Sequence, residues 1–347
     1  MQRKQISVGG LTVGGGSSVS IQSMTSTKTE NIPATLAQIQ ALAQAGCEVV
    51  RLAVPNEAAA VAFGKIRQDV SIPMVADIHF DHRLALLAID HGADKIRINP
   101  GNIGGEEKVR LVVDACKKKG LPIRIGVNGG SLEPSIIAQY GHGPEALVQS
   151  ALGHVKILNR FDFDDICLSV KSSSVADTVG AYRLLHARTN YPLHLGVTEA
   201  GTSYIGTIKN AMGIGSLLLD GIGDTIRVSL TADPVEEIRA AKAILQSAGR
   251  RRFSPEVISC PTCGRCEIDL ISLAKEVESR LEGIQANITV AVMGCAVNGP
   301  GEAKQADYGI AGGRGEGLLF AKGVPLQKLP TEQLVNALFD TITQNIQ

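Results

Sequence analysis

The chain has 347 residues, of which 44% are hydrophobic and 3% aromatic, with 38 glycines and no tryptophan, a composition typical of an α/β enzyme with one large and one small domain. Its 34 basic and 34 acidic residues give a net charge of zero, which argues against a general nucleic-acid-binding surface. The longest apolar runs fall far short of the roughly 18 residues that span a bilayer, so we expect no membrane segment. The N-terminus lacks the apolar stretch of a secretion signal, so we expect a cytoplasmic chain whose cysteines are reduced or metal-bound.

The first part of the chain predicts a barrel. Residues 4–14 are typical of a hairpin, which we expect to cover the bottom of that barrel. From residue 18 to about 248, short β-rich runs alternate with amphipathic helical stretches that often end in glycine. The runs lie at residues 19–24, 48–54, 73–79, 94–99, 122–128, 165–171, 193–199 and 224–230. Eight such units predict a (β/α)8 TIM barrel, ahead of a doubly wound open sheet, because no dinucleotide fingerprint follows the first run.

The barrel pattern ends near residue 248. We therefore assign residues 1–248 to the barrel, 249–257 to a linker and 258–347 to a small α/β domain. The expected elements of the small domain are a helix near 267–282, a strand at 288–294, β segments around 308–324 and a final helix near 331–345.

The alternation of side chains along the predicted strands places polar residues inside the barrel. In the run 122–128, Arg124 and Asn128 share one face, while the apolar residues of the other face must contact the surrounding helices. The same argument assigns interior positions to Arg51, Asp77, His79, Arg97, Asn99, Ser169, Lys171, His194, Arg227 and Ser229. Glu199 stands at the very end of its run, at the barrel mouth.

This interior is unusually basic, because most barrels are filled with Val, Ile and Leu. Four arginines and one lysine outnumber the single interior acid that alternation finds, Asp77. Burying an unpaired cation costs several kcal/mol, so we expect a bound anion, and guanidinium groups match phosphate oxygens in shape. A diphosphate is therefore the expected kind of ligand. The alternative for any one arginine is a structural salt bridge.

Other interior groups permit more than one role. Lys171 also suits a Schiff base, since cationic neighbours would lower its pKa. Glu199 suits a general acid or base, or an ion-pair partner for an arginine. His79 and His194 are either substrate contacts or hydrogen-bonded interior histidines.

The segment SCPTCGRCEID carries cysteines at positions 260, 263 and 266, and its C-x2-C pair is a strong indication of a metal. Cys295 is the remaining cysteine downstream. Spacing leaves two ligand sets open. One is Cys260, Cys263, Cys266 and Cys295, for zinc or a [4Fe–4S] cluster, and the other replaces Cys266 with a ligand that is not a cysteine.

Several long motifs in this sequence resemble those of the bacterial 4-hydroxy-3-methylbut-2-enyl diphosphate synthase family. The resemblance spans both expected domains. The motifs are VADIHFD (75–81), RINPGNIG (97–104), IRIGVN (123–128), GVTEAG (196–201), RVSLTADPVEE (227–237), CPTCGR (260–265) and GCAVNGPGE (294–302).

The resemblance implies an iron–sulfur oxidoreductase of the non-mevalonate pathway of isoprene biosynthesis. It implies reductive ring opening and dehydroxylation of 2-C-methyl-D-erythritol 2,4-cyclodiphosphate to 4-hydroxy-3-methylbut-2-enyl diphosphate, with electrons from flavodoxin or ferredoxin. It also implies a homodimer in which the cluster domain of one subunit caps the barrel of the other.

The resemblance further implies roles for individual residues. A [4Fe–4S] cluster is expected on Cys260, Cys263, Cys295 and Glu302, with Glu302 as an exchangeable ligand, while Cys266 departs from the usual motif as a neighbouring thiol. Glu199 matches a glutamate implicated in proton delivery. The positions expected to hold substrate are Arg51, Arg97, Arg124, Asn128, Lys171 and Ser229, with Asp77, His79 and Arg227 as further candidates.

Two alternatives remain open at the level of the sequence. One is a Schiff-base TIM-barrel aldolase or lyase that uses Lys171 on a phosphorylated substrate and carries a structural zinc. The other is a polyphosphate-binding module with a zinc ribbon, which binds anions without turnover.

Overall fold

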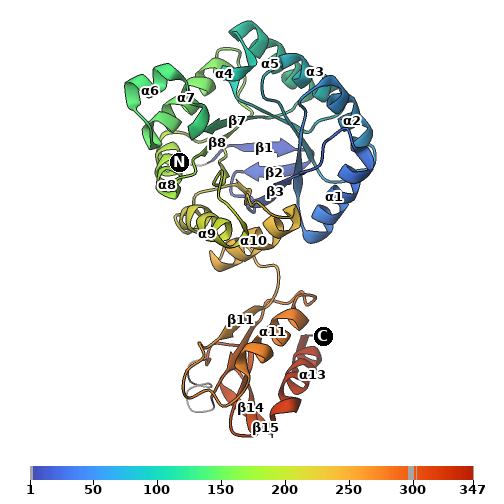
Figure 1. Cartoon of the computed structure of the whole chain (residues 1–347), viewed down its shortest axis with the longest axis vertical. Coiled ribbons are helices and arrows are strands. Elements are labelled where there is room, and N and C mark those ends of the chain that lie inside the picture. The colour runs from blue at the N-terminus through green and yellow to red at the C-terminus, as the bar shows by residue number, and fades with distance from the viewer. Residues whose placement is uncertain (1–2, 296–300, 302, 347) are drawn as a thin grey trace. The chain divides into compact units, whose positions relative to one another are not determined.

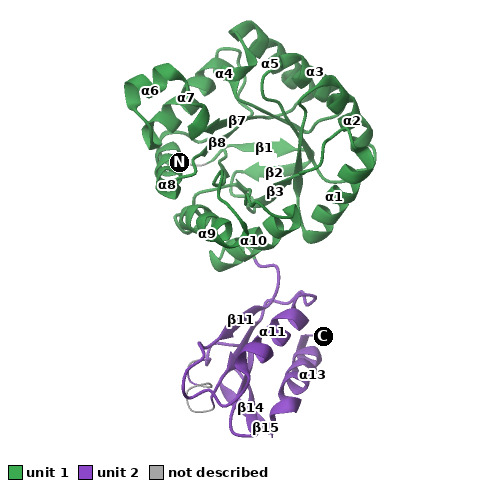
Figure 2. Cartoon of the chain, in the orientation of Figure 1, with its two compact units in different colours: residues 1–251 green, residues 252–347 purple. Residues whose placement is uncertain are grey.

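The computed structural model describes residues 3–295, 301 and 303–346. The chain forms two compact units, residues 1–251 and 252–347 (Figure 2). The boundary falls inside the stretch 249–257 that we assigned to a linker. Each unit contains its own sheet and its own helices (Figure 1).

The first unit is built on an eight-stranded sheet in the order β8-β7-β6-β5-β4-β3-β10-β9, with parallel pairing throughout. A parallel bridge between Leu168 and Leu193 links the two ends of this order, which confirms the predicted barrel. The strands are β3 (Ser20–Met24), β4 (Val49–Ala53), β5 (Met74–Asp77), β6 (Lys95–Ile98), β7 (Ile123–Asn128), β8 (Ile166–Lys171), β9 (His194–Leu195) and β10 (Thr225–Ile226).

The last two barrel strands are much shorter than the runs predicted for them. Strand β9 ends before Gly196, and a Cβ atom at that position would lie 2.4 Å from Lys171 Nζ and 2.8 Å from the Arg227 carbonyl oxygen. Glycine in a strand commonly marks such a close approach and weakens the strand. Gly196 thus makes room for Lys171.

Helices surround the barrel, as Figure 1 shows. They are α1 (Ile32–Ala45), α2 (Glu57–Arg67), α3 (His82–Asp90), α4 (Pro100–Ile103), α5 (Glu106–Lys119), α6 (Pro134–Tyr140), α7 (Pro144–Asn159), α8 (Val175–Arg188), α9 (Ser203–Leu219) and α10 (Pro234–Ser247), with a 3-10 turn at Gly129–Ser131. Helix α1 illustrates the local signals. The Asn31 side chain accepts a hydrogen bond from the backbone N–H of Ala34 at its start, and Gly46 ends it in the left-handed region at φ 101°.

An antiparallel hairpin of β1 (Gln5–Val8) and β2 (Leu11–Gly14) precedes the barrel. Its buried side chains form a cluster with residues near the starts of three barrel strands. The cluster is Ile6, Val8, Val13, Val49, Val75 and Cys167. The hairpin therefore closes the N-terminal end of the barrel with an apolar floor.

The second unit contains a five-stranded sheet in the order β11-β12-β13-β14-β15, parallel across the first three strands and antiparallel beyond. Helices α11 (Leu270–Leu281) and α13 (Leu334–Ile346) contribute residues such as Val277 and Leu338 to a core shared with this sheet. The strands are β11 (Glu256–Ser259), β12 (Thr289–Met293), β13 (Tyr308–Ala311), β14 (Glu316–Ala321) and β15 (Val324–Pro330), with a 3-10 turn at Thr331–Gln333. Within the described ranges, no helix combines the length and the apolar character needed to cross a membrane.

Candidate functional site

The barrel interior gathers the basic side chains that alternation along the strands predicted. Parallel register places Arg97 beside Arg124 and Asn128 beside Lys171, and paired residues share a face of the sheet. Arg97, Arg124 and Lys171 are at most 7% exposed. The pKa of Lys171 lies well below its usual range. The main cause is burial, followed by the positive charges of Arg124, Arg227, Arg51 and Arg97. The five cations therefore lie close enough to act on one another.

Asp77 lies between two of these cations. One carboxylate oxygen is 3.1 Å from Arg97 Nη1, and the other is 3.7 Å from Arg51 Nε and 3.3 Å from His79 Nε2. Burial disfavours the charged carboxylate, yet Arg51, His79 and Arg97 together hold the pKa of Asp77 well below its usual range. Asp77 thus stays ionised and offsets one of the two positive charges that Arg51 and Arg97 share around it.

Arg227 forms an ion pair with a second buried acid. Glu237 on α10 is 3% exposed and lies 3.3 Å from the Arg227 guanidinium. It also accepts hydrogen bonds from Ser23 Oγ at 2.9 Å and from the Leu230 backbone at 3.2 Å. The prediction that Asp77 is the only acid beside these cations is therefore wrong. Strand alternation missed Glu237 because it is carried by a helix.

Arg124 and Lys171 have no such partner. No carboxylate of the described residues lies within ion-pair distance of either side chain. Arg124 Nε and Nη2 are buried without a hydrogen-bond partner, and burial with Arg97 lowers the pKa of Arg124 to about 10. Buried polar atoms in native proteins are nearly always satisfied. These two cations are therefore the part of the interior best suited to an incoming anion.

The other predicted residues of this group line the same end of the barrel or its interior. Asn128 ends β7 and is half-buried, as is Ser229, while the His79 side chain is 53% exposed at the rim. His194 is fully buried, with Nδ1 3.4 Å from Thr225 Oγ1. Asn99 instead accepts a hydrogen bond from the Gly101 N–H and starts α4.

Glu199 follows β9 in an unusual backbone conformation. Its φ is +52°, in the left-handed region, and its side chain is exposed. A non-glycine residue in this region is strained by about 1–3 kcal/mol, and such strain is concentrated at functional sites. The conformation supports a functional role for Glu199 independently of its sequence motif.

In the second unit, two cysteines follow neighbouring parallel strands. Cys260 comes directly after β11, and Cys295 comes two residues after β12. Register pairs Ser259 with Val292, so both strands end at one edge of the sheet. The Gly294 N–H donates to Cys260 Sγ at 3.2 Å, which ties these two chain segments together.

Cys263 and Cys266 differ in their surroundings. Cys263 is exposed, and hydrogen bonds from the backbone and side chain of Arg265 lower the pKa of its thiol. Cys266 Sγ instead donates to the Ile268 carbonyl at 3.2 Å and packs against the core of the unit. A Cβ atom on Gly294 would lie 2.7 Å from that sulfur. Cys263 is thus the more accessible ligand of the two.

The donor set fits an iron–sulfur cluster in its chemistry. Thiolates are soft ligands that suit iron–sulfur clusters, and metal sites are commonly completed only when the metal binds. Among the residues that the structure describes, no three His, Cys, Asp or Glu side chains already form a metal-binding group. Glu302, the remaining ligand implied by the family resemblance, lies outside the described residues.

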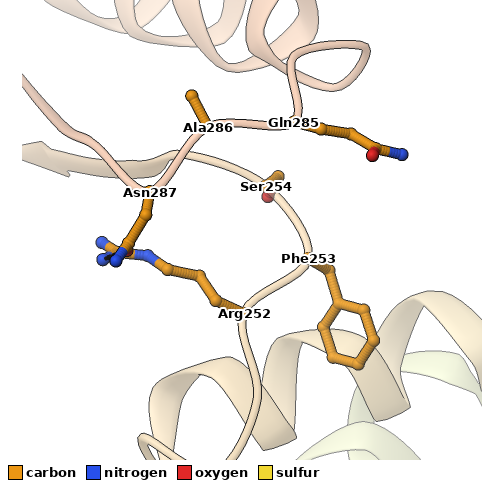
Figure 3. Close-up of a pocket in the computed structure, with 6 residues that line it drawn as sticks. All are labelled: Arg252, Phe253, Ser254, Gln285, Ala286 and Asn287. Atoms are coloured by element: carbon orange, nitrogen blue, oxygen red, sulfur yellow. Dashed lines mark hydrogen bonds between the residues drawn. The ribbon is translucent and has the colours of Figure 1, made fainter.

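A cavity of about 350 Å³ lies elsewhere in the second unit (Figure 3). Arg252 and Asn287 point toward each other across it and are hydrogen-bonded, and Arg252 Nη2 also donates to Thr289 Oγ1 at 3.1 Å. Its lining residues are Arg252, Phe253, Ser254, Gln285, Ala286 and Asn287. None of them is a thiol or a carboxylate, so this cavity is not the candidate site.

Family models match both units. The GcpE TIM-barrel domain matches residues 3–242, and the GcpE protein C-terminal domain matches residues 256–344. The chain belongs to the GcpE family. The predicted family resemblance and TIM barrel are thereby confirmed.

Curated relatives of this GcpE chain are named 4-hydroxy-3-methylbut-2-en-1-yl diphosphate synthase (flavodoxin). The protein of Clostridium perfringens is 58% identical over 342 residues, which cover 98% of each chain. The protein of Geobacter sulfurreducens is 57% identical and covers 96% of this chain and 95% of its own. The protein of Bacillus subtilis is 56% identical and covers 96% and 89%.

Solved structures with similar folds include dihydropteroate synthases. The enzyme of Stenotrophomonas maltophilia aligns with 71% of this chain and 98% of its own at a TM-score of 0.52 and 12% identity. That of Vibrio fischeri aligns over the same shares at 0.51 and 11%. At such low identity, the likeness supports the barrel fold alone.

Proposed function

We propose that this protein is an iron–sulfur oxidoreductase that converts 2-C-methyl-D-erythritol 2,4-cyclodiphosphate to 4-hydroxy-3-methylbut-2-enyl diphosphate. The observation that carries the proposal is the pair of buried cations without carboxylate partners, Arg124 and Lys171, inside the barrel of a GcpE-family chain. A doubly charged cyclic diphosphate supplies the missing counter-charge, and guanidinium–phosphate contacts fix its orientation.

The residues around this pair have different tasks in the proposal. Arg124 and Lys171 bind phosphate oxygens directly. Arg51 and Arg97, which share the single carboxylate of Asp77, and Arg227, which pairs with Glu237, orient the ligand, and the charge left over keeps the surrounding potential positive. Further ligand contacts come from one exposed and two half-buried residues at the barrel mouth. These are His79, Asn128 and Ser229.

We call the ends of β11 and β12, with the loop that follows β11, the cysteine edge of the second unit. In this proposal the cysteine edge holds the cofactor. Cys260, Cys263 and Cys295 hold a [4Fe–4S] cluster, and Glu302 is its exchangeable ligand. The bound cluster supplies electrons one at a time and an iron that can accept an oxygen ligand. Cys266 remains a neighbouring thiol, engaged by the Ile268 carbonyl.

Glu199 supplies the proton of the reaction. Its carboxyl group stands at the mouth of the barrel, where it donates a proton to the C3 hydroxyl as that group leaves as water. The left-handed backbone conformation of Glu199, which is uncommon outside functional sites, supports this role. The opening of the cyclic diphosphate leaves a linear diphosphate on Arg124 and Lys171.

The electron donor in the proposal is flavodoxin, the protein named for the curated relatives, with ferredoxin as a second donor of the same kind. The reducing cytoplasm suits a chain whose cysteines carry a cluster, so we assign the protein to that compartment. Both assignments are predictions.

We infer further that the protein acts as a homodimer in which the cluster domain of one subunit serves the barrel of the other. Helix α9 supports an interface, because Tyr204, Ile208 and Met212 share one helical face and are 76%, 40% and 60% exposed. The test mixes Arg124→Met, which binds substrate weakly, with Cys263→Ser, which lacks the cluster, at a substrate concentration too low for either variant to turn over alone. Mixed dimers would recover about a quarter of the wild-type rate, because half of the dimers are mixed and each keeps one intact site. No recovery despite subunit exchange would contradict the shared site.

The proposed activity is tested by anaerobic purification followed by turnover. The purified protein should be brown and contain about four irons and four sulfides per chain. With reduced flavodoxin or a chemical reductant, phosphorus NMR should show the cyclodiphosphate converted to a linear diphosphate. A colourless zinc protein that borohydride links to its substrate through Lys171 would instead support the aldolase alternative, which the comparisons do not favour.

A further inference from the structure

A further buried cation, Lys95, lies deeper in the barrel than the proposed anion site. Lys95 is on β6, two residues before Arg97, so both side chains point to the same face of the sheet. Register pairs Lys95 with Val75, a member of the apolar cluster at the barrel floor. The residue is 1% exposed. Lys95 thus stands one layer below Arg97, between the anion site and the hairpin.

The groups that act on Lys95 come from four other strands. They are Arg51 on β4, Arg124 on β7, Cys167 on β8 and His194 on β9. The hairpin beneath contributes the apolar side chains of Ile6, Val8 and Val13, with Leu11 packed against them, to the floor.

No carboxylate in the described part of the chain compensates Lys95. Asp77 is engaged by Arg51 and Arg97, as described above. The neighbouring Asp94 accepts the Met74 N–H and pairs with Arg67 at 3.6 Å. Among the described residues, the positive charge of Lys95 therefore has no fixed negative partner.

The protonation of Lys95 follows from these surroundings. Burial above all, with smaller contributions from Arg124 and Arg51, lowers its pKa to about 8 against an opposing effect of Cys167. The free protein therefore loses this proton as the pH rises through about 8. An anion held by Arg124 favours the charged form and raises the pKa again.

We propose that Lys95 takes up a proton when the cyclic diphosphate binds above it, and so supplies an additional positive charge beneath the anion site. The inference rests on the proposed function and deepens it, since neither the sequence motifs nor the family comparisons single out this residue. Its role is to position and stabilise the bound diphosphate through the charge it adds to the site.

The test uses the anaerobic holoenzyme with its cluster oxidised and no reductant, so that the cyclodiphosphate binds without turnover. Each phosphorus of this ligand carries a single strongly acidic hydroxyl, so the ligand itself does not titrate near pH 8. Calorimetric titration at pH 8.5 in two buffers of different ionisation enthalpy measures the protons taken up. The wild type should take up a substantial fraction of a proton, and its affinity should fall as the pH rises from 7.5 to 9.5.

Three variants separate charge from structure. Lys95→Met should bind about tenfold more weakly at pH 6.5 and lose the part of the proton uptake that belongs to Lys95, while Lys171, whose pKa is also lowered, keeps its own part. Lys95→Arg should keep the affinity and also lose that part of the uptake, because arginine stays charged throughout. Lys118→Met, at an exposed position of α5, should match the wild type.

The outcomes distinguish the inference from the proposed function. Proton uptake that persists unchanged in folded Lys95→Met or Lys95→Arg protein overturns the role of Lys95 and leaves the proposed activity standing. A wild-type holoenzyme that does not bind the cyclodiphosphate at all overturns the proposed function and the inference together. If Lys95→Met fails to fold, the arginine variant gives the answer alone.

Discussion

The anion site of the barrel and the cysteine edge of the second unit are built in contrasting ways. In the barrel, Arg97, Arg124 and Lys171 are held by strands, are nearly inaccessible to water and act on one another electrostatically. At the cysteine edge, Cys263 is exposed and lies in the loop after β11. The described thiols do not yet form a group able to hold a metal.

The contrast indicates which process supplies the free energy that forms each site, folding of the barrel or binding of the metal. The fold of the barrel keeps cations buried in advance, so their repulsion is relieved when an anion binds. The cysteine edge places its thiols on flanking loops, and under the proposed function metal binding would supply the free energy that gathers them. The first site should therefore survive changes to the second, whereas the second depends on its own ligand.

The largest expected effect is at the cysteine edge. Cys263→Ser removes an exposed thiolate ligand, so iron content should fall to near zero and the rate by at least about a thousandfold, because no cluster remains to carry electrons. Iron and sulfide analysis with the visible spectrum measures this. Cys116→Ser, a buried change in α5, should keep the cluster. A Cys263→Ser protein with wild-type iron and rate would remove Cys263 from the ligand set.

The next effect is at Glu199. Glu199→Gln removes the proton but keeps the shape, so kcat should fall by about 10²–10⁴ while the iron content and the affinity for cyclodiphosphate stay unchanged. Pre-steady-state and steady-state rates with a chemical reductant separate these quantities. Full activity in this variant would refute the proton role.

A matched pair of arginines sharpens the account of the barrel. Arg124→Met removes a cation without a carboxylate partner, so ligand affinity should fall about a hundredfold with no loss of thermal stability. Arg227→Met leaves Glu237 buried without its partner, so the free energy of unfolding should fall by about 3–5 kcal/mol. Calorimetric titration and thermal unfolding measure the two quantities. Equal stability losses in both variants would contradict the assignment of a free and a compensated arginine.

The smallest effect is expected at Cys266. Its sulfur contacts the Ile268 carbonyl and the core, so Cys266→Ser should keep the cluster spectrum and change the rate by less than about threefold. Loss of the cluster in this variant, with the cluster retained in Glu302→Ala, would favour the four-thiolate set over the set that includes Glu302.

The barrel and most of its interior were predictable from the sequence, because strand alternation alone identifies the face of Arg124 and Lys171. Alternation also predicts that Lys95 points into the barrel. That it is a buried cation without a carboxylate partner becomes clear only from the structure. Glu237 was not predictable in this way, since a helix turn carries it to Arg227. Cysteine spacing did not decide the cluster ligands, because Cys266 can reach the cluster whether the backbone after Cys263 is extended or helical. Glu302 was suggested by the family resemblance alone.

The contrast between the two sites is tested most directly by titrating a cluster-free Cys260→Ser/Cys263→Ser protein with cyclodiphosphate. A barrel that holds its anion site ready before binding should bind this ligand with a Kd within about threefold of the oxidised holoenzyme, since the cations that bind phosphate are unchanged. A cluster-free protein that keeps its native circular dichroism but no longer binds cyclodiphosphate would contradict the account.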